Sequence, residues 1–225
     1  MKFVHQTLLA SLLIMTGVFA AQAGIVIGGT RLIFDGSKKE ASLSVNNPDN
    51  SPYLVQSWID VLSDSAQKPP FIITPPLYRL DKGQQNVERI VLTGTLPQDR
   101  ESLFWLNIKS IPSATTVENS LQIAVKTRIK LIYRPAGLMR STPEEQANKL
   151  IWRRSGNNIE VTNPTDYVMN FNEITVGDKK IQEVTWVLPH AQTAISLPAH
   201  TTSSAVVFKL INDYGGTGEA HTANL

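Results

Sequence analysis

One stretch of the chain, residues 120–134, alternates between two kinds of side chain over an unusual length. It reads Ser-Leu-Gln-Ile-Ala-Val-Lys-Thr-Arg-Ile-Lys-Leu-Ile-Tyr-Arg. One parity is mainly apolar and the other mainly basic: Leu121, Ile123, Val125, Ile129, Leu131 and Tyr133 against Lys126, Arg128, Lys130 and Arg134. Because successive side chains of a strand point to opposite faces, the pattern predicts one β-strand with an apolar and a basic face.

This predicted strand is long enough to extend beyond its own sheet. Typical strands have about 5–6 residues, and this stretch is more than twice that length. A strand that outruns its sheet has an open apolar edge, which favours aggregation unless a partner covers it. Two interpretations therefore remain open: an ordinary long core strand with a solvated basic face, or an edge that is kept for a partner.

The rest of the chain predicts short strands separated by turns every 8–12 residues, which is typical of β-sandwiches. The predicted strands are 25–34, 41–47, 53–62, 71–74, 86–93 and 102–111, then 150–154, 159–162, 167–174, 180–188, 193–197 and 203–212. Asn47-Pro48 and Asn163-Pro164 occupy similar turns in the two halves, which supports two domains of one type. We place the boundary between 136 and 143, predict a short helical turn at 142–145, and expect a loose tail over 215–225.

The N-terminus has the pattern of a signal peptide. Lys2 and His5 precede an apolar run over 8–20, and Ala21-Gln22-Ala23 fits a cleavage site, so the mature chain is expected to begin at Gly24. The apolar run is shorter than the roughly 20 residues of a membrane span. We expect an exported protein that is not inserted in a membrane.

The composition argues against an enzyme, a metal site and a cofactor. The chain has no cysteine, and its mature part has three histidines, His190, His200 and His221, without ligand spacing. No nucleophile elbow or zinc-protease motif is present. A net charge of +2 is too weak to indicate a nucleic-acid partner. A secreted hydrolase is therefore disfavoured.

The basic face of the predicted long strand allows two interpretations. It could be merely solvated, or its cations could hold a small anion such as a carboxylate. Arg31 could be a second cation of this site. It lies among apolar neighbours, where burying a charged side chain is costly unless the charge is paired. Sequence spacing does not show that Arg31 and Lys130 meet. We expect no aromatic side chains interleaved on this face.

Six motifs in order make this sequence similar to the PapD-like periplasmic pilus chaperones over essentially the whole mature chain. They are Gly29-Thr30-Arg31, Tyr53-Leu54-Val55-Gln56-Ser57-Trp58, Thr74-Pro75-Pro76-Leu77, the segment 96–105, Arg128-Ile129-Lys130-Leu131 with Tyr133-Arg134-Pro135, and Ile211-Asn212-Asp213-Tyr214-Gly215. The resemblance implies an all-β fold of two immunoglobulin-like sandwiches in an L shape with an interdomain cleft. The expected divisions are 1–23 for the signal peptide, 24–138 and 139–225.

The resemblance also implies the functional residues. Arg31 and Lys130 match the cations that grip the C-terminal carboxylate of a pilin subunit. Leu121, Ile123 and Val125 match the apolar side chains that fill the groove of the incomplete subunit. A buried charge cluster near the domain junction falls on Glu101, Arg134 and Asp213.

The implied function is a non-enzymatic chaperone of the periplasm. It binds and folds pilin subunits by donor-strand complementation, caps them against premature assembly, and delivers them to an outer-membrane usher for fimbria assembly. The short, cysteine-free connection at 112–119 resembles the short F1-G1 loop branch of the family, and Asp166 departs from the family pattern. Self-capping as a homodimer stays open for the free protein. The alternative is a structural pilus subunit or adhesin, disfavoured because two complete-looking domains are predicted.

Overall fold

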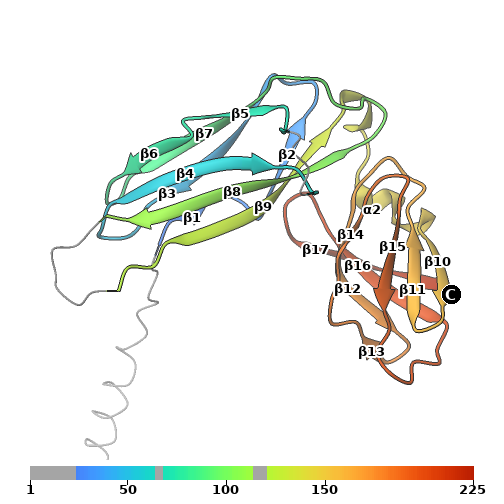
Figure 1. Cartoon of the computed structure of the whole chain (residues 1–225). Coiled ribbons are helices and arrows are strands. Elements are labelled where there is room, and N and C mark those ends of the chain that lie inside the picture. Colours follow the sequence, from blue (N-terminus) through green and yellow to red (C-terminus); the bar gives the residue numbers. More distant parts are fainter. Residues whose placement is uncertain (1–23, 64–67, 114–120) are drawn as a thin grey trace, which may run out of the picture.

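The computed structural model describes residues 24–63, 68–113 and 121–225 (Figure 1). The predicted signal peptide, 1–23, lies outside the described residues. Figure 1 shows two bodies of strands set at an angle, the first coloured blue to yellow-green and the second yellow to red. The predicted all-β fold with two sandwiches in an L shape is therefore confirmed.

The N-terminal sandwich consists of β1 to β9. These strands are β1 (Val26–Ile27), β2 (Arg31–Asp35), β3 (Glu40–Asn46), β4 (Tyr53–Asp60), β5 (Phe71–Thr74), β6 (Leu77–Leu80), β7 (Gln85–Leu92), β8 (Ser102–Pro112) and β9 (Val125–Arg134). One sheet has the order β1-β3-β7-β5 and the other the order β2-β9-β8-β4-β6. The long alternating stretch thus lies next to the edge strand β2 of the second sheet.

The C-terminal sandwich consists of β10 to β17. Its strands are β10 (Ile151–Ser155), β11 (Asn158–Thr162), β12 (Met169–Val176), β13 (Lys179–Lys180), β14 (Trp186–Val187), β15 (Gln192–Ser196), β16 (Ala205–Ile211) and β17 (Thr217–Asn224). One sheet runs β10-β11-β15 and the other β13-β12-β16-β17, with β14 also paired to β12. Between the sandwiches lie the short helices η1 (Ala136–Leu138), α2 (Pro143–Gln146) and η2 (Ala147–Lys149), and the Thr142 side chain caps α2 as predicted.

Each sandwich has its own aromatic core between its two sheets. In the N-terminal sandwich Phe71 packs edge-on against Phe34 and Phe104, with ring centroids 5.6 Å and 5.1 Å apart. In the C-terminal sandwich Trp152 and Phe208 lie 5.1 Å apart by the same measure. Offset and edge-to-face pairs of this kind contribute beyond the area they bury, so each sandwich is held by its own core rather than by disulfides.

Two strand predictions and the prediction of a loose tail were wrong. The predicted strand 25–34 is two strands in different sheets, and 180–188 holds only the short β13 and β14. The tail is not loose, because β17 pairs with β16 along the edge of its sheet. Its residues are small and polar, so no hydrophobic alternation marked it, yet an edge strand is stabilised mainly by main-chain hydrogen bonds and by contacts such as the stacking of His221 on Phe208.

Candidate functional site

The strand β9 has an open edge over half of its length. On one side β8 pairs with it from Val125 to Tyr133. On the other side β2 pairs in parallel only with residues 130–134, so within the described residues no strand covers 125–129 there. The main-chain groups of this half of the edge are available to an additional strand.

The opening exists because the chain changes sheets before β2. The strand β1 pairs with β3 in the opposite sheet, and the Gly28 N–H donates to the Ser44 carbonyl at 2.9 Å. A Cβ atom on Gly28 would lie 2.0 Å from the Ser44 hydroxyl and 3.2 Å from the Ser44 carbonyl oxygen, so a larger residue would require the Ser44 side chain to move and would crowd its backbone. The chain then crosses over and joins β9 only from Arg31 onward.

Three large apolar side chains before and at the start of β9 face solvent. Leu121 is 86 % exposed, Ile123 66 % and Val125 52 %, whereas Ile129 and Leu131, of the same parity, are buried in the core. The strand itself begins at Val125, later than predicted, and residues 121–124 pair with no strand in the part of the chain that the structure describes. The alternating apolar row therefore continues from the core into solvent beside the open edge. An exposed apolar row of this kind is typical of a surface that binds a partner.

Arg31 and Lys130 meet where the open edge ends. They are Cα partners in the parallel pair of β2 and β9, which places both cations on one face of the sheet. The Arg31 guanidinium donates to the Ile211 carbonyl of the C-terminal sandwich at 3.1 Å, and its buried Nε has no partner among the described residues. Burial lowers the Arg31 pKa, while the Asp213 carboxylate opposes this shift.

Lys130 is held between the two sandwiches by residues of the C-terminal sandwich. Its Nζ donates a hydrogen bond to the Asn170 Oδ1 and lies 4.5 Å from the centroid of the Trp186 ring. Burial, and then the neighbouring charge of Arg31, lowers the Lys130 pKa to about 8. Two close cations that are partly withdrawn from water form a site suited to a small anion.

The three predicted members of the charge cluster come together at the junction of the sandwiches. The Arg134 guanidinium donates to Glu101 at 2.5 Å and to both oxygens of Asp213 at 2.6 Å and 2.7 Å. The second Glu101 oxygen accepts from the Val168 N–H at 2.6 Å. Burial alone would lower the Arg134 pKa, but the two carboxylates raise it, so the guanidinium stays charged. The cluster joins the residue before β8, the end of β9 and the C-terminal sandwich in one hydrogen-bonded unit.

A close backbone approach beside the cluster brings the motif at 211–215 against the motif at 29–31. Gly215, in the turn after Asp213, has a φ of +86°, and a Cβ on it would lie 2.1 Å from the Thr30 hydroxyl. Thr30 directly precedes Arg31. This close approach presses the C-terminal turn against the start of β2.

Replacing Gly215 with alanine should disturb both stability and the domain junction. The positive φ alone should destabilise an alanine by about 1 kcal/mol, and the clash with Thr30 adds to it. The matched control is Gly83→Ala, which has a φ of +68° and open space at its Cβ. In thermal melts Gly215→Ala should lose more stability than Gly83→Ala, and equal losses would show that the contact with Thr30 contributes nothing.

Sequence reasoning missed the aromatic neighbours of the basic face. Each of three cations lies over a tryptophan ring. The distance from the cation to the ring centroid is 5.0 Å for Lys126 and Trp58, 5.3 Å for Arg128 and Trp105, and 4.5 Å for Lys130 and Trp186. The expectation of no interleaved aromatic residues was therefore wrong. The rings come from β4 and β8 of the same sheet as β9 and from β14 of the C-terminal sandwich, so no local pattern in 120–134 could have shown them.

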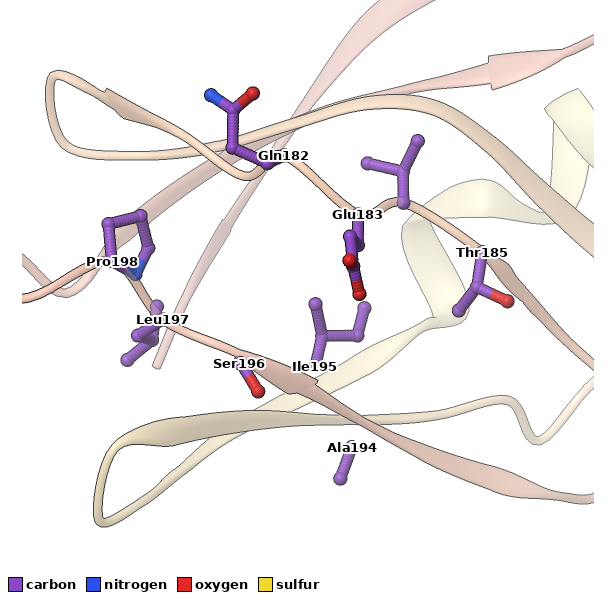
Figure 2. Close-up of a pocket in the computed structure, with 9 residues that line it drawn as sticks. Gln182, Glu183, Thr185, Ala194, Ile195, Ser196, Leu197 and Pro198 are labelled. Atoms are coloured by element: carbon purple, nitrogen blue, oxygen red, sulfur yellow. The ribbon is translucent and has the colours of Figure 1, made fainter.

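A hollow in the C-terminal sandwich lies apart from this site. It has a volume of about 710 Å³ and is lined by residues 182–185 and 194–198. Figure 2 shows the Glu183 side chain pointing into it between the two segments. The lining offers a carboxylate and no cation, which does not suit an anion. Within the described ranges no group of histidine and acidic side chains could hold a metal ion, and no helix is long and apolar enough to cross a membrane.

Two family models match the chain and cover most of it. Residues 24–139 match "Pili and flagellar-assembly chaperone, PapD N-terminal domain", and residues 145–222 match "Pili assembly chaperone PapD, C-terminal domain". The chain therefore belongs to the PapD-like family of pilus assembly chaperones. Members of this family are chaperones rather than enzymes, and they act in the periplasm.

Individual relatives and solved structures agree with this assignment. The probable fimbrial chaperone LpfB of Escherichia coli O157:H7 is 44 % identical, with 100 % of this chain and 98 % of the relative covered. The chaperone protein FimC of Escherichia coli K12 is 40 % identical over 92 % and 88 % of the two chains. The structure of a Salmonella enterica SafA pilin in complex with the SafB chaperone matches with a TM-score of 0.82, 35 % identity, and coverage of 92 % and 99 %.

Proposed function

We propose that this protein captures pilin subunits by adding its own strand to them and by gripping their C-terminal carboxylate. The observation that carries the proposal is the position of Arg31 and Lys130 at the inner end of the open half of β9. A subunit strand lying along this edge with its carboxylate at the two cations must run parallel to β9. The solved SafA pilin complex with the SafB chaperone supports a pilin as the partner.

The two parts of the site have different tasks. Main-chain hydrogen bonds along 125–129 fix the register of the subunit strand. Leu121, Ile123 and Val125 fill the groove of the incomplete subunit, and each fully buried side chain contributes about 1.5–3 kcal/mol. The carboxylate between Arg31 and Lys130 fixes the end of the strand, because charge-assisted hydrogen bonds are strong in a partly desolvated cleft.

A cross-linking experiment tests the strand-donation step. The chain has no cysteine, so Ile123→Cys creates a single attachment site for a photoreactive group. Illumination in the periplasm should link this position to a pilin, at a residue inside its hydrophobic groove. The same group at Ile151→Cys, an exposed apolar position of β10, is the control. Equal labelling of one partner from both positions, or none from Ile123→Cys, would refute strand donation.

Capture should weaken above about pH 8. The ammonium form of Lys130 binds the carboxylate, and its pKa in the free protein is about 8. Below this pH Lys130 is already charged, so the affinity for the carboxylate does not change with pH. Above it Lys130 must take up a proton before it can bind the carboxylate, so the affinity falls by up to about tenfold per pH unit. Calorimetry with a carboxylate-terminated pilin peptide should show this decline, and the C-terminal amide and Lys130→Met should not. A flat profile up to about pH 9.5 for the wild type would contradict the role of Lys130.

Further parts of the proposal follow from membership of the family. The chaperone caps the assembly surface of the subunit and delivers it to an outer-membrane usher. The signal peptide is cleaved after Ala23, and the domain division lies between 138 and 139. In the free state a second copy covers the open edge of β9, since an exposed apolar edge favours self-association. A structural pilus subunit or adhesin is not favoured, because the relatives that align over the whole chain are chaperones.

A further inference from the structure

Asn170 is a buried polar residue of the C-terminal sandwich that contacts the N-terminal sandwich through Lys130. Its side chain lies on β12 and is only 2 % exposed. Its Oδ1 accepts the hydrogen bond from the Lys130 Nζ. Its Cα partner across the strand pair is Trp186, whose ring lies against the same ammonium group. One pair of adjacent residues thus supplies a hydrogen-bond acceptor and an aromatic face to a single cation.

The N-terminal sandwich encloses the same lysine from the other side. Arg31 is the Cα partner of Lys130 on β2, and Trp105 is its Cα partner on β8. Trp105 also packs edge-on against Trp186, with ring centroids 5.5 Å apart. The flexible lysine side chain therefore passes between walls from both sandwiches, and Asn170 holds its tip. An ordered tip lowers the entropy lost when a ligand binds.

We propose that Asn170 is a positioning residue of the carboxylate clamp, which holds the Lys130 ammonium beside Arg31 before the subunit arrives. An ammonium group has three donors, so the bond to Asn170 leaves donors for the incoming carboxylate. Both sandwiches then contribute to the clamp, because the Ile211 carbonyl of the C-terminal sandwich likewise accepts a hydrogen bond from Arg31. This inference rests on the proposed function, because a positioning residue needs the clamp to have its ligand.

The electrostatic surroundings make this role measurable. The charged group that acts on Lys130 is Arg31 on β2, whose own charge is opposed by Asp213 beyond β16, and Arg128 lies on the same face of β9. From the C-terminal sandwich β12 and β14 present the uncharged Asn170 and Trp186. The hydrogen bond that the Asn170 Oδ1 accepts from the Lys130 ammonium favours the charged form of Lys130. It therefore opposes the lowering of the Lys130 pKa by burial and by Arg31.

Two nearly isosteric variants should move the Lys130 pKa in opposite directions. Asn170→Leu removes the acceptor, so the pKa should fall by about one unit below its wild-type value of about 8. Asn170→Asp places a carboxylate at the same point, so the pKa should rise by about 1–3 units. The measurement is an NMR titration of the lysine side-chain carbons, with the Lys130 signal assigned by its loss in Lys130→Met.

Asn107→Leu is the matched control. Asn107 is another buried asparagine, and its Oδ1 accepts from the Arg128 Nε at 3.1 Å, one cation away on the same face of β9. This variant should leave the Lys130 pKa unchanged. A residue with a merely structural role would lower thermal stability without moving that pKa, so unchanged Lys130 titration in both Asn170 variants would overturn the proposal.

A binding measurement separates this inference from the proposed function. The probe is a synthetic peptide of alternating apolar and polar residues with a free C-terminal carboxylate, compared with its C-terminal amide. At pH 7 both Asn170 variants should bind the free-carboxylate peptide about tenfold more weakly, and Asn170→Asp does so because its own carboxylate competes. If Lys130→Ala binds like the wild type, the clamp itself fails. If Lys130→Ala loses binding but both Asn170 variants keep it, the clamp stands and the role of Asn170 is refuted.

Discussion

Lys130→Ala is expected to abolish the capture of pilin subunits without unfolding the protein. The substitution removes one of the two cations at the end of the open edge and leaves a subunit carboxylate poorly paired beside Arg31. Loss of one partner from a desolvated charge pair costs roughly 2–5 kcal/mol, which lowers affinity by about 30-fold or more. Because burial and the charge of Arg31 already disfavour the ammonium form, its loss should not lower the folding stability.

The control for this prediction lies on the same strand. Lys126 shares the face of β9 with Lys130 and rests on Trp58, but it is exposed and distant from Arg31 in the strand register. Lys126→Ala should retain capture within a few-fold, because exposed charges contribute little. Binding of a carboxylate-terminated peptide, measured by calorimetry beside thermal melts of all three proteins, decides the matter. Equal affinities of Lys130→Ala and the wild type would exclude Lys130 from the anchor.

Glu101→Ala is expected to have the largest effect on stability. Glu101 is fully enclosed, and its two oxygens accept hydrogen bonds from the Arg134 guanidinium and the Val168 N–H. Its removal leaves the buried Arg134 cation with Asp213 as its remaining carboxylate among the described residues, and it leaves the Val168 N–H without its acceptor. Breaking a buried pair in this way costs about 3–5 kcal/mol, which in a chain of this size lowers Tm by about 10 °C.

The same variant should loosen the angle between the sandwiches. Glu101 on the N-terminal side and Val168 on the C-terminal side are joined directly, so small-angle scattering should show a wider range of domain orientations. Glu183→Ala, at an exposed glutamate away from the junction, should change neither property. If Glu101→Ala melts and scatters like Glu183→Ala, the charge cluster does not hold the junction.

The sequence predicted the long strand and both sandwiches because their residues alternate with the period of a half-buried strand. It could not predict β17, whose small polar residues are placed by pairing with β16 at an edge. The change of sheets at Gly28 was equally invisible, because a close backbone approach leaves no mark in a hydrophobic pattern.

The site was predicted through family motifs rather than through physics alone. Parity placed Lys130 on the basic face, but the meeting of Arg31 with Lys130 depends on the register of two strands about a hundred residues apart. The two residues that contact the Lys130 ammonium, Asn170 and Trp186, belong to the C-terminal sandwich. A residue that contributes one hydrogen bond across an interface has no sequence periodicity, so the structure was needed to reveal it.

The most direct test of capture through the carboxylate clamp is co-purification from the native periplasm. Tagged wild type, Lys130→Ala and Lys126→Ala are isolated in parallel, and the bound proteins are identified by mass spectrometry. We expect a pilin subunit in near-stoichiometric amount with the wild type and Lys126→Ala, and its absence from Lys130→Ala. Equal recovery of that subunit with all three proteins, or recovery of long self-polymers alone, would contradict this expectation.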